Sequence, residues 1–565
     1  MKKAFTLVEL MGVIVILGVM SSIVTVTVNK NIQKGNITTC LAQEKTIIEA
    51  AKTRQVDKPN DNSKKITIST LKSEGYLDDT LENPMTGKPY NDNTYVSNSK
   101  GTYELVYVGE KDCTNTMGKT EEEILASLPV IKSWTSSAST DFHDKKYKEN
   151  ITSIEFIDLN DDNVTLPADA PNNTTSWDVS EKGNQSVIAW VTADPQDNDK
   201  YVLHIAAKDG VFANKNSASY FSGFKNLKSV AFNDNFDTSY VTDMSYMFDN
   251  CEKLTNIDLS NFNTENTTKM HNMFYNCKSL QNLNLKSFNT KNVTDMGAMF
   301  QYCESLTELD LSNFNTSKVT TMIVMFDSCK NLKKLNIKNF DTSNVETMLA
   351  MFSNCSSIES IDVSSFNTSK VTNMLRMFHS CDSLKSIDVS GFNTSNVTDM
   401  QEMFCNCESL KNLDLSNFNT SNVTTMYQMF MGTESLENLN IKSFNTSKVT
   451  TMRSMFAGCK NLTELDLSSF DTSKVTVMGG DPEKLEVNPH SLNDGMFENN
   501  TKLKKIYVSN LFNTSNVTKS YDMFYNCPLL EGGNGTAVAT KKVYDKTYAK
   551  IDKPGQEGYF TQKTN

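Results

Sequence analysis

Apolar and polar residues follow a pattern that repeats along more than half of the chain. From Phe236 the sequence reads FDTSYVTDMSYMFDNCEKLTNIDLSN, and a near copy begins every 26 residues. The copies begin at Phe236, Phe262, Phe288, Phe314, Phe340, Phe366, Phe392, Phe418, Phe444 and Phe470, and one more begins at Phe512, after the insertion 479–495. Repetition at a period of roughly 20 to 50 residues is typical of a solenoid.

Two spacings within each copy predict its secondary structure. Met270, Met273 and Phe274 lie three or four residues apart, which is typical of one helix face. Leu283 and Leu285 then alternate with polar residues, which indicates a strand with one buried face. The Asn-Thr-Ser links suit turns and helix N-caps. The pattern predicts an α/β solenoid of helix–strand units that share one apolar core.

A long apolar stretch at the N-terminus predicts a membrane-spanning helix. Residues 5–28 contain one ionisable side chain, Glu9. As a helix they extend about 36 Å, which is enough to cross a bilayer. Lys2 and Lys3 precede the stretch, which favours an N-terminus on the cytoplasmic side. A secretory signal peptide is the alternative, but the long apolar run and its carboxylate argue against it.

The start of the chain, KKAFTLVEL, resembles the processing site of type IV pilins and pseudopilins. In that family a prepilin peptidase cleaves before the Phe and methylates the new amino group. The resemblance implies a leader of residues 1–4, cleavage between Ala4 and Phe5, and pairing of Glu9 with the N-terminal amine of a neighbouring subunit in a filament. Ala4 stands where the family usually has Gly, but Ala is small enough that cleavage is expected to occur.

Residues 5–118 are predicted to form a pilin-like α+β domain. Its helix continues over residues 29–53, and its packing positions are Ile37, Leu41, Ile48 and Ala51. Short aromatic runs between turns then predict a small meander of strands. Cys40 and Cys113 bracket this region, and an exported domain can join them by a disulfide. Their spacing equally allows two separate thiols.

The rest of the chain divides by composition into a linker at 119–136, a β-rich cap at 137–220, the solenoid at 221–530 and a C-terminal cap at 531–565. The FNTSxVTxMxxMFxxCxxLxxLDLS units, WDVSEKGNQSVIAWV before them and YAKIDKPGQEGYFT after them resemble the BspA-type leucine-rich-repeat surface proteins of bacteria. That resemblance implies a leucine-rich-repeat-like fold and display on a cell surface. Some members of that family act in adhesion.

Charge and motifs argue against several functions. A net charge of -12 and a pI near 5.1 make nucleic acid an unexpected partner. The sequence contains no glycine-rich phosphate loop and no nucleophile elbow, so an enzyme is not expected. A catalytic cluster would have to lie within residues 137–220. None of the 5 histidines has a second ligand at metal spacing, so no metal and no cofactor are expected.

Most of the cysteines share one position of the repeat, on the predicted Met/Phe face. There they are expected to pack in the core as small apolar side chains. A stack of helices places equivalent Cα atoms roughly 8–10 Å apart, which exceeds the reach of a disulfide, about 7 Å. Cys405 lies off that face and is predicted to be exposed and reactive.

The outward strand positions form polar columns that are the predicted binding face. One column contains Asp258, Asn284, Asp310, Asn336, Asp362, Asp388, Asp414, Asn440 and Asp466, and the next contains Lys286, Lys338 and Lys442. A solvated face that keeps stacked strands soluble is one interpretation. Weak multivalent contact that gains strength by avidity is the other. The insertion 479–495 is the most localised candidate.

These features together predict a minor type IV pilin-like surface protein that displays a leucine-rich-repeat domain for adhesion or protein binding, at a pilus tip. Its expected partners are other pilin subunits, a prepilin peptidase, the cytoplasmic membrane before assembly, and an unknown host, cell-surface or matrix ligand. The alternative is a membrane-tethered surface protein, or a pseudopilin of a secretion or DNA-uptake machine. Both place the chain at the cell surface, in a pilus or anchored by residues 5–28.

Overall fold

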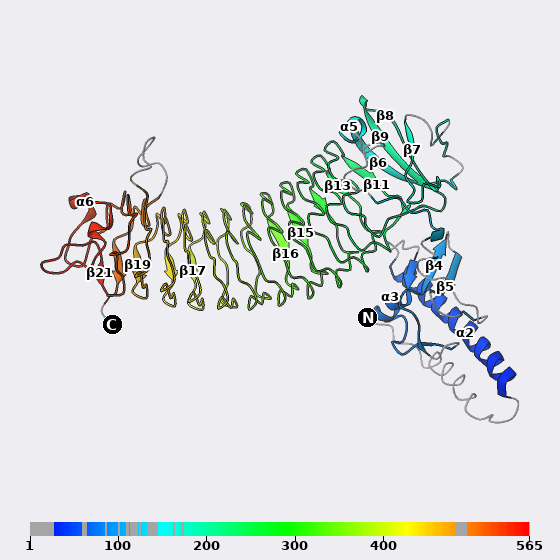
Figure 1. Cartoon of the computed structure of the whole chain (residues 1–565), viewed down its shortest axis with the longest axis horizontal. Coiled ribbons are helices and arrows are strands. Elements are labelled where there is room, and N and C mark those ends of the chain that lie inside the picture. Colours follow the sequence, from blue (N-terminus) through cyan, green and yellow to red (C-terminus); the bar gives the residue numbers. More distant parts are fainter. Residues whose placement is uncertain are drawn as a thin grey trace. The chain divides into compact units, whose positions relative to one another are not determined.

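The computed structural model describes residues 28–58, 65–84, 88–99, 102–108, 112–113, 123, 126–133, 145–161, 164–168, 170, 175–481 and 494–563. The chain divides into two compact units, residues 1–128 and 129–565 (Figure 1). The division falls within the predicted linker 119–136. Ile131, near the end of that linker, is already buried in the core of the second unit.

The first unit packs one long helix against a small sheet. Helix α2 (Val28–Asp57) is followed by β1 (Lys65–Thr67) and α3 (Ile68–Ser73). The antiparallel sheet has the order β1-β4-β5, and β4 (Tyr95–Ser99) and β5 (Thr102–Val106) form a hairpin; β2 (Glu82–Asn83) and β3 (Lys88–Pro89) form a separate pair. The helix predicted over residues 29–53 is confirmed, and it continues to Asp57.

The buried face of α2 differs from the predicted one. Cys40, Ile47 and Ala51 are buried against the sheet, and Ile48 packs at the edge of this core. Leu41, which was predicted to pack, is 52% exposed. Cys40, Ile47 and Ala51 are seven and four residues apart, so they lie on one side of the helix, and Leu41 is turned about 100° away from Cys40.

The second unit begins with a five-stranded mixed sheet in the order β11-β6-β9-β8-β7. Its strands are β6 (Ile151–Asp158), β7 (Ser176–Asp178), β8 (Val187–Asp194), β9 (Asp197–Ala207) and β11 (Ser229–Ala231), and the short helix α5 (Lys145–Lys148) precedes them. Strand β11 is also the first strand of the repeats, and it pairs with β6 in parallel. Phe156 of β6 stacks on Phe232 at 5.3 Å between ring centroids. The cap and the repeats therefore share one core.

The repeats form a stack of coils joined by two parallel ladders. One ladder consists of short strands that pair with the strand of the next coil, as Leu309 of β15 (Glu308–Asp310) pairs with Leu335 of β16 (Lys334–Asn336). The others are β13 (Asn256–Ile257), β14 (Asn282–Leu283), β17 (Asn412–Asp414), β18 (Asn438–Asn440) and β19 (Glu464–Leu467). The second ladder is a single bridge per coil, such as Asp243 to Lys269.

The helix predicted in each repeat is wrong. The segment from Met244 to Asn250 is a run of turns, and its backbone N–H groups donate to the next coil, as Phe248 N does to Met273 O at 2.9 Å. Tyr246 and Asn250 both have a φ of 58°. This left-handed conformation recurs at the same positions in later coils and interrupts the hydrogen bonds of a helix. The solenoid is therefore built from strands and turns.

Apolar columns fill the space between the ladders. Met, Phe, Val and Leu side chains of successive coils merge into one core that also takes in the cap. Phe274 and Phe300 stack with ring planes 5° apart and centroids 5.9 Å apart, and the same contact recurs along the stack. Each coil therefore buries its apolar residues against the coils on either side.

The stack continues across the insertion and ends under a cap. Strand β19 pairs in parallel with β20 (Lys505–Val508), so the coils on either side of the insertion are neighbours. Strand β21 (Thr561–Gln562) pairs with β20, and Tyr559 and Phe560 are fully buried against the last coils. The short helices α6 (Val538–Lys541) and η2 (Lys546–Tyr548) complete this cap. Most of the insertion lies outside the described residues.

Candidate functional site

The predicted processing and assembly residues, Ala4, Phe5 and Glu9, lie outside the described residues, as does the predicted span 5–28 apart from Val28. Among the helices that the structure describes, none combines the length and the apolar character needed to cross a membrane. The roles of these three residues stay predictions from sequence.

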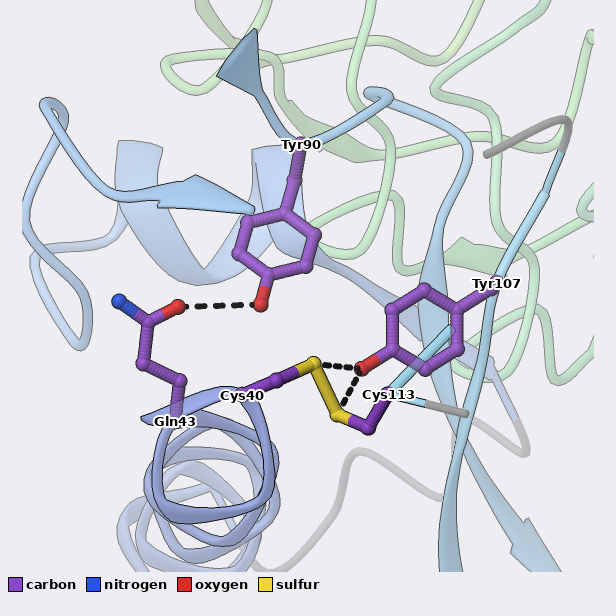
Figure 2. The surroundings of a disulfide bond; sticks show 5 residues. All are labelled: Cys40, Gln43, Tyr90, Tyr107 and Cys113. Carbon is purple, nitrogen blue, oxygen red and sulfur yellow. Dashed lines mark hydrogen bonds between the residues drawn. A yellow bond between two sulfur atoms is a disulfide. The ribbon is translucent and has the colours of Figure 1, made fainter. Parts of the chain in front are cut away.

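The structure joins Cys40 and Cys113 by a disulfide, as one of the two interpretations of the sequence predicted. Figure 2 shows the Tyr107 hydroxyl beside both sulfur atoms, 3.2 Å from Cys113 Sγ and 3.6 Å from Cys40 Sγ. Nearby, the Tyr90 hydroxyl donates to Gln43 Oε1 at 3.1 Å. The disulfide ties the middle of α2 to the segment that follows β5, so it closes the pilin-like unit on itself.

The polar columns of the predicted binding face lie where the sequence placed them, on the outward side of the strands. Asp258, Asn284, Asp310, Asp362, Asp388, Asp414, Lys286, Lys338 and Lys442 are exposed, and Asn336, Asn440 and Asp466 are half-buried. Asp466 forms an ion pair with Lys563 of the C-terminal cap, with 3.1 Å between Oδ2 and Nζ. Neighbouring coils also contact each other within the column, as Asn336 Nδ2 donates to Asp310 Oδ1 at 2.9 Å.

Each aspartate of the column also stabilises the turn that follows its own strand. Asp388 Oδ1 accepts the backbone N–H of Ser390 at 2.9 Å, and Asp362 Oδ1 accepts both the backbone N–H and the hydroxyl of Ser364. Hydrogen bonds from these serines lower the pKa of both carboxyl groups. The uniformity of the column is therefore explained by a turn that every coil needs.

Two hollows interrupt the regular surface of the repeats. A shallow groove of about 700 Å³ lies over the strands between residues 282 and 362, where Lys334 pairs with Glu308 at 2.5 Å. A smaller hollow of about 350 Å³ lies where Gly432 and Gly458 occupy the position that carries Asn406 and Asn499 in the adjoining coils. Both glycines have a positive φ, like the asparagines they replace. Their missing side chains leave a polar recess lined by amides and carboxylates.

The repeat cysteines are buried free thiols, as predicted for all of them except Cys405. The spacing predicted between equivalent cysteines was wrong, because it assumed a layer of stacked helices. In the described repeats, neighbouring coils hydrogen-bond directly to each other without such a layer. Cys277 Sγ, for example, donates to Phe248 O of the preceding coil at 3.1 Å. Burial raises the pKa of these thiols, Cys303 among them.

The prediction that Cys405 is exposed and reactive is wrong. Its side chain is 0% exposed, and burial raises the pKa of its thiol to about 12. The error follows from the helix prediction: on a helix this residue would point away from the core, whereas the turn directs it inward between coils. There it meets His379 and Glu402, and the three ligand atoms lie within 4.8 Å of one another. Spacing along the chain did not indicate this cluster, because its ligands come from two coils that are one repeat apart.

Comparison with protein families finds one match in the repeats and one at the N-terminus. Residues 215–334, 302–412, 381–488 and 487–550 match the family described as Mycoplasma protein of unknown function, DUF285. These segments together cover more than half of the 565 residues. The chain belongs to the DUF285 family. In this DUF285 protein, residues 1–25 also match the prokaryotic N-terminal methylation motif. That motif implies processing by a prepilin peptidase, assembly with pilins, and a location at the membrane or cell surface.

Solved structures similar to this DUF285 protein include two with low identity. One is a TLR13–ssRNA13 complex, with 19% identity and a TM-score of 0.21, covering 57% of this chain and 46% of that chain. The other is a leucine-rich repeat protein from Eubacterium ventriosum ATCC 27560, with 17% identity and a TM-score of 0.28, covering 68% of this chain and 92% of that chain. No curated protein matches the chain. The repeat domain itself is a stack of coils built from strands and turns.

Proposed function

We propose that this chain is a minor type IV pilin-like surface protein that displays its repeat domain for adhesion or protein binding, at the tip of a pilus. The observation that carries the proposal is the presence of an N-terminal methylation motif and a DUF285 repeat domain in one chain. The methylation motif allows the chain to be processed and to assemble with pilin subunits. The repeat domain offers a large surface and acts by binding rather than by catalysis.

The size of the repeat domain favours a minor subunit over a major one. Unit two comprises residues 129–565, and the first unit only 1–128. A filament in which every subunit carried so large a domain would be crowded. A single subunit at the tip avoids this crowding and presents the repeat domain to the surroundings. The resemblance to BspA-type surface proteins supports adhesion as the purpose of the display.

The arrangement of charges on the repeats supports weak and repeated contacts. The outward carboxylates are engaged by their own turns and by neighbouring coils, as in the pairs Lys385–Glu359 at 2.6 Å and Lys334–Glu308 at 2.5 Å. Such exposed pairs contribute little energy each, so a ligand can replace them at small cost. A contact that recurs from coil to coil gains strength by avidity.

The alternative function also uses the N-terminal motif but does not involve assembly into a pilus. In that version the chain is a membrane-tethered surface protein or a pseudopilin of a secretion or DNA-uptake machine. The size of the second unit favours surface display over a role inside such a machine, where less space surrounds the subunit.

Sheared filaments distinguish these versions. Filaments are removed from cells, purified and digested, and mass spectrometry searches for two peptides: one from the repeats and one that begins with methylated Phe5. The proposal predicts both peptides in the filament fraction, at a small fraction of the abundance of the major pilin. Their restriction to the membrane fraction would favour the tethered protein and contradict the pilus-tip role.

A further inference from the structure

The repeat period brings three side chains with metal-binding chemistry together in one place. His379 and Cys405 are 26 residues apart, so they occupy the same position in neighbouring coils, and Glu402 lies in the same turn as Cys405. At the position of His379 and Cys405 the other coils carry varied residues, such as Asp249, Asp327, Ser353, Met431 and Ala457. Among the residues that the structure describes, this is the one group of three or more His, Cys, Asp or Glu side chains close enough to share an ion.

The geometry of the cluster is close to that of a metal site. The ligand atoms of His379, Glu402 and Cys405 all lie within 4.8 Å of one another, and His379 Nε2 is 3.4 Å from Glu402 Oε2. Bond lengths of about 2.0–2.3 Å place tetrahedral zinc ligands roughly 3.3–3.7 Å apart. The distance between His379 Nε2 and Glu402 Oε2 already lies in this range. A small movement that brings these two atoms and the Cys405 sulfur closer together completes the site.

Burial and hydrogen bonding leave the imidazole of His379 available. The side chain of Glu402 is 9% exposed and that of His379 is 19% exposed, so the cluster opens to solvent beside the histidine. His379 Nδ1 is buried and has no hydrogen-bond partner. Nε2 is the ring nitrogen next to Glu402, and it is the atom that coordinates the ion.

We propose that His379, Glu402 and Cys405 form a binding site for a divalent transition metal of the Zn²⁺ class. Imidazole nitrogen, thiolate sulfur and carboxylate oxygen are the three ligand types that zinc takes in proteins. Three protein ligands leave one coordination position open, on the solvent side of the cluster. Water occupies that position in the isolated protein, and an atom of a partner can replace it.

Arg376 positions the carboxylate for this role. Its Nε and Nη2 donate to the two oxygens of Glu402 at 2.8 and 2.9 Å. Carboxylates that bind metals are usually held by such a hydrogen-bonding partner, and each oxygen keeps a lone pair for the ion. The guanidinium group is half exposed, so it can also shift towards solvent as the ion binds.

The protonation states that metal binding requires are reached by loss of one proton. Burial lowers the pKa of His379, so its ring is neutral near pH 7 and has a lone pair to donate. The Cys405 thiol is protonated in the free protein because burial raises its pKa. On binding, the sulfur–hydrogen bond breaks, the sulfur–metal bond forms, and the proton goes to solvent.

Titration of the full-length, detergent-solubilised protein with Co²⁺ tests the site, because cobalt bound to a thiolate gives a charge-transfer absorption band in the near ultraviolet. The expected result is one equivalent of bound Co²⁺ with this band, and displacement of Co²⁺ by Zn²⁺. Cys405→Ala abolishes the band, and His379→Ser and Glu402→Gln each weaken binding by about tenfold or more.

The controls come from the repeat itself. Ala457 and Ser353 occupy the corresponding position in other coils, so Cys405→Ala and His379→Ser introduce residues that the coil tolerates. His271 also faces a carboxylate, with Nδ1 3.4 Å from Asp295 Oδ2, but it belongs to no such cluster. His271→Ala is therefore expected to leave the band unchanged. Absence of the band in the parent protein, or its persistence in correctly folded Cys405→Ala, would overturn the proposal.

Discussion

A buried threonine in each coil makes two hydrogen bonds to the coil that follows. The Thr342 hydroxyl donates to Asn367 O at 3.0 Å and accepts the backbone N–H of Asn367 at 2.8 Å. The Thr342 side chain is 0% exposed. The same pair of bonds recurs at Thr264, Thr290, Thr368, Thr394 and Thr420. This explains the constant threonine after each repeat phenylalanine.

The first prediction concerns this threonine. Thr342→Val keeps the shape of the side chain but removes the partner of the Asn367 backbone N–H and C=O, so it is expected to cost about 1–3 kcal/mol. Thr342→Ser keeps both bonds and is expected to cost less. Denaturant unfolding of the repeat domain measures the difference, with Thr320→Val at an exposed position as the control. Equal midpoints for Thr342→Val and Thr342→Ser would contradict this account.

A buried glutamate makes the stability of the repeats depend on pH. Glu498 is 1% exposed, and burial raises its pKa to about 7, while Gly495 N donates to its Oε2 at 3.0 Å. The folded state therefore holds the proton more tightly than the unfolded chain, whose glutamates titrate near pH 4.3. Stability is greatest below that value and falls as the pH rises towards 7.

Glu498→Gln is the matching variant, because it copies the neutral form of the side chain. It is expected to unfold at a higher temperature than the parent at pH 8 and at the same temperature at pH 4. Each pKa unit of difference corresponds to about 1.4 kcal/mol. The exposed Glu464→Gln is the control, with no expected change in the pH profile. A parent profile that is flat between pH 4 and 8 would be inconsistent with a buried, titrating Glu498.

At the scale of the element, the sequence predicted the register of the coils and the strand that each contains. The period of 26 residues and the alternation around Leu283 were sufficient for this. The conformation of the Met/Phe segment could not be predicted from spacing, because a helix and a run of turns can both bury residues three and four apart. Asn250 and Asn276 carried a signal, since Asn is one of the few residues other than Gly that readily adopt the left-handed conformation found there.

The same limit explains which parts of the candidate site could be predicted. The outward columns followed from the strand period alone. The cluster of His379, Glu402 and Cys405 depends on which residues of two coils face each other, and a helix assignment turned Cys405 the wrong way. The repeat period would have revealed the pair, because His379 and Cys405 are one period apart.

The disulfide of the pilin-like unit gives a prediction at this scale. Cys40 and Cys113 are 73 residues apart, and closing a loop of this length is expected to stabilise the folded unit by about 4 kcal/mol. Cys113→Ser should therefore increase amide hydrogen exchange in β4 and β5, while the strands of the repeats exchange as before. Cys405→Ala serves as the control for loss of a cysteine. Unchanged exchange in β4 and β5 would show that the bond does not hold this unit together.

At the scale of the whole molecule, two kinds of sequence information define the two parts. The repeats determine an architecture but assign no ligand, since near-identical coils present near-identical faces. The N-terminal methylation motif assigns a route to the surface and a mode of assembly. The chain combines a pilin-like N-terminal motif with a DUF285 repeat domain, and the proposed role of the first part is to hold the repeats away from the cell.

Surface labelling of the repeat domain tests this account most directly. Antibodies against residues 221–530 are applied to intact cells that carry the parent chain or Glu9→Ala, with and without the pilus motor, at equal amounts of total protein. Labelling at the ends of filaments is expected for the parent chain. Loss of filament labelling is expected for Glu9→Ala and for cells without the motor. Filament labelling that persists in Glu9→Ala, or repeats that antibodies never reach on intact cells, would contradict it.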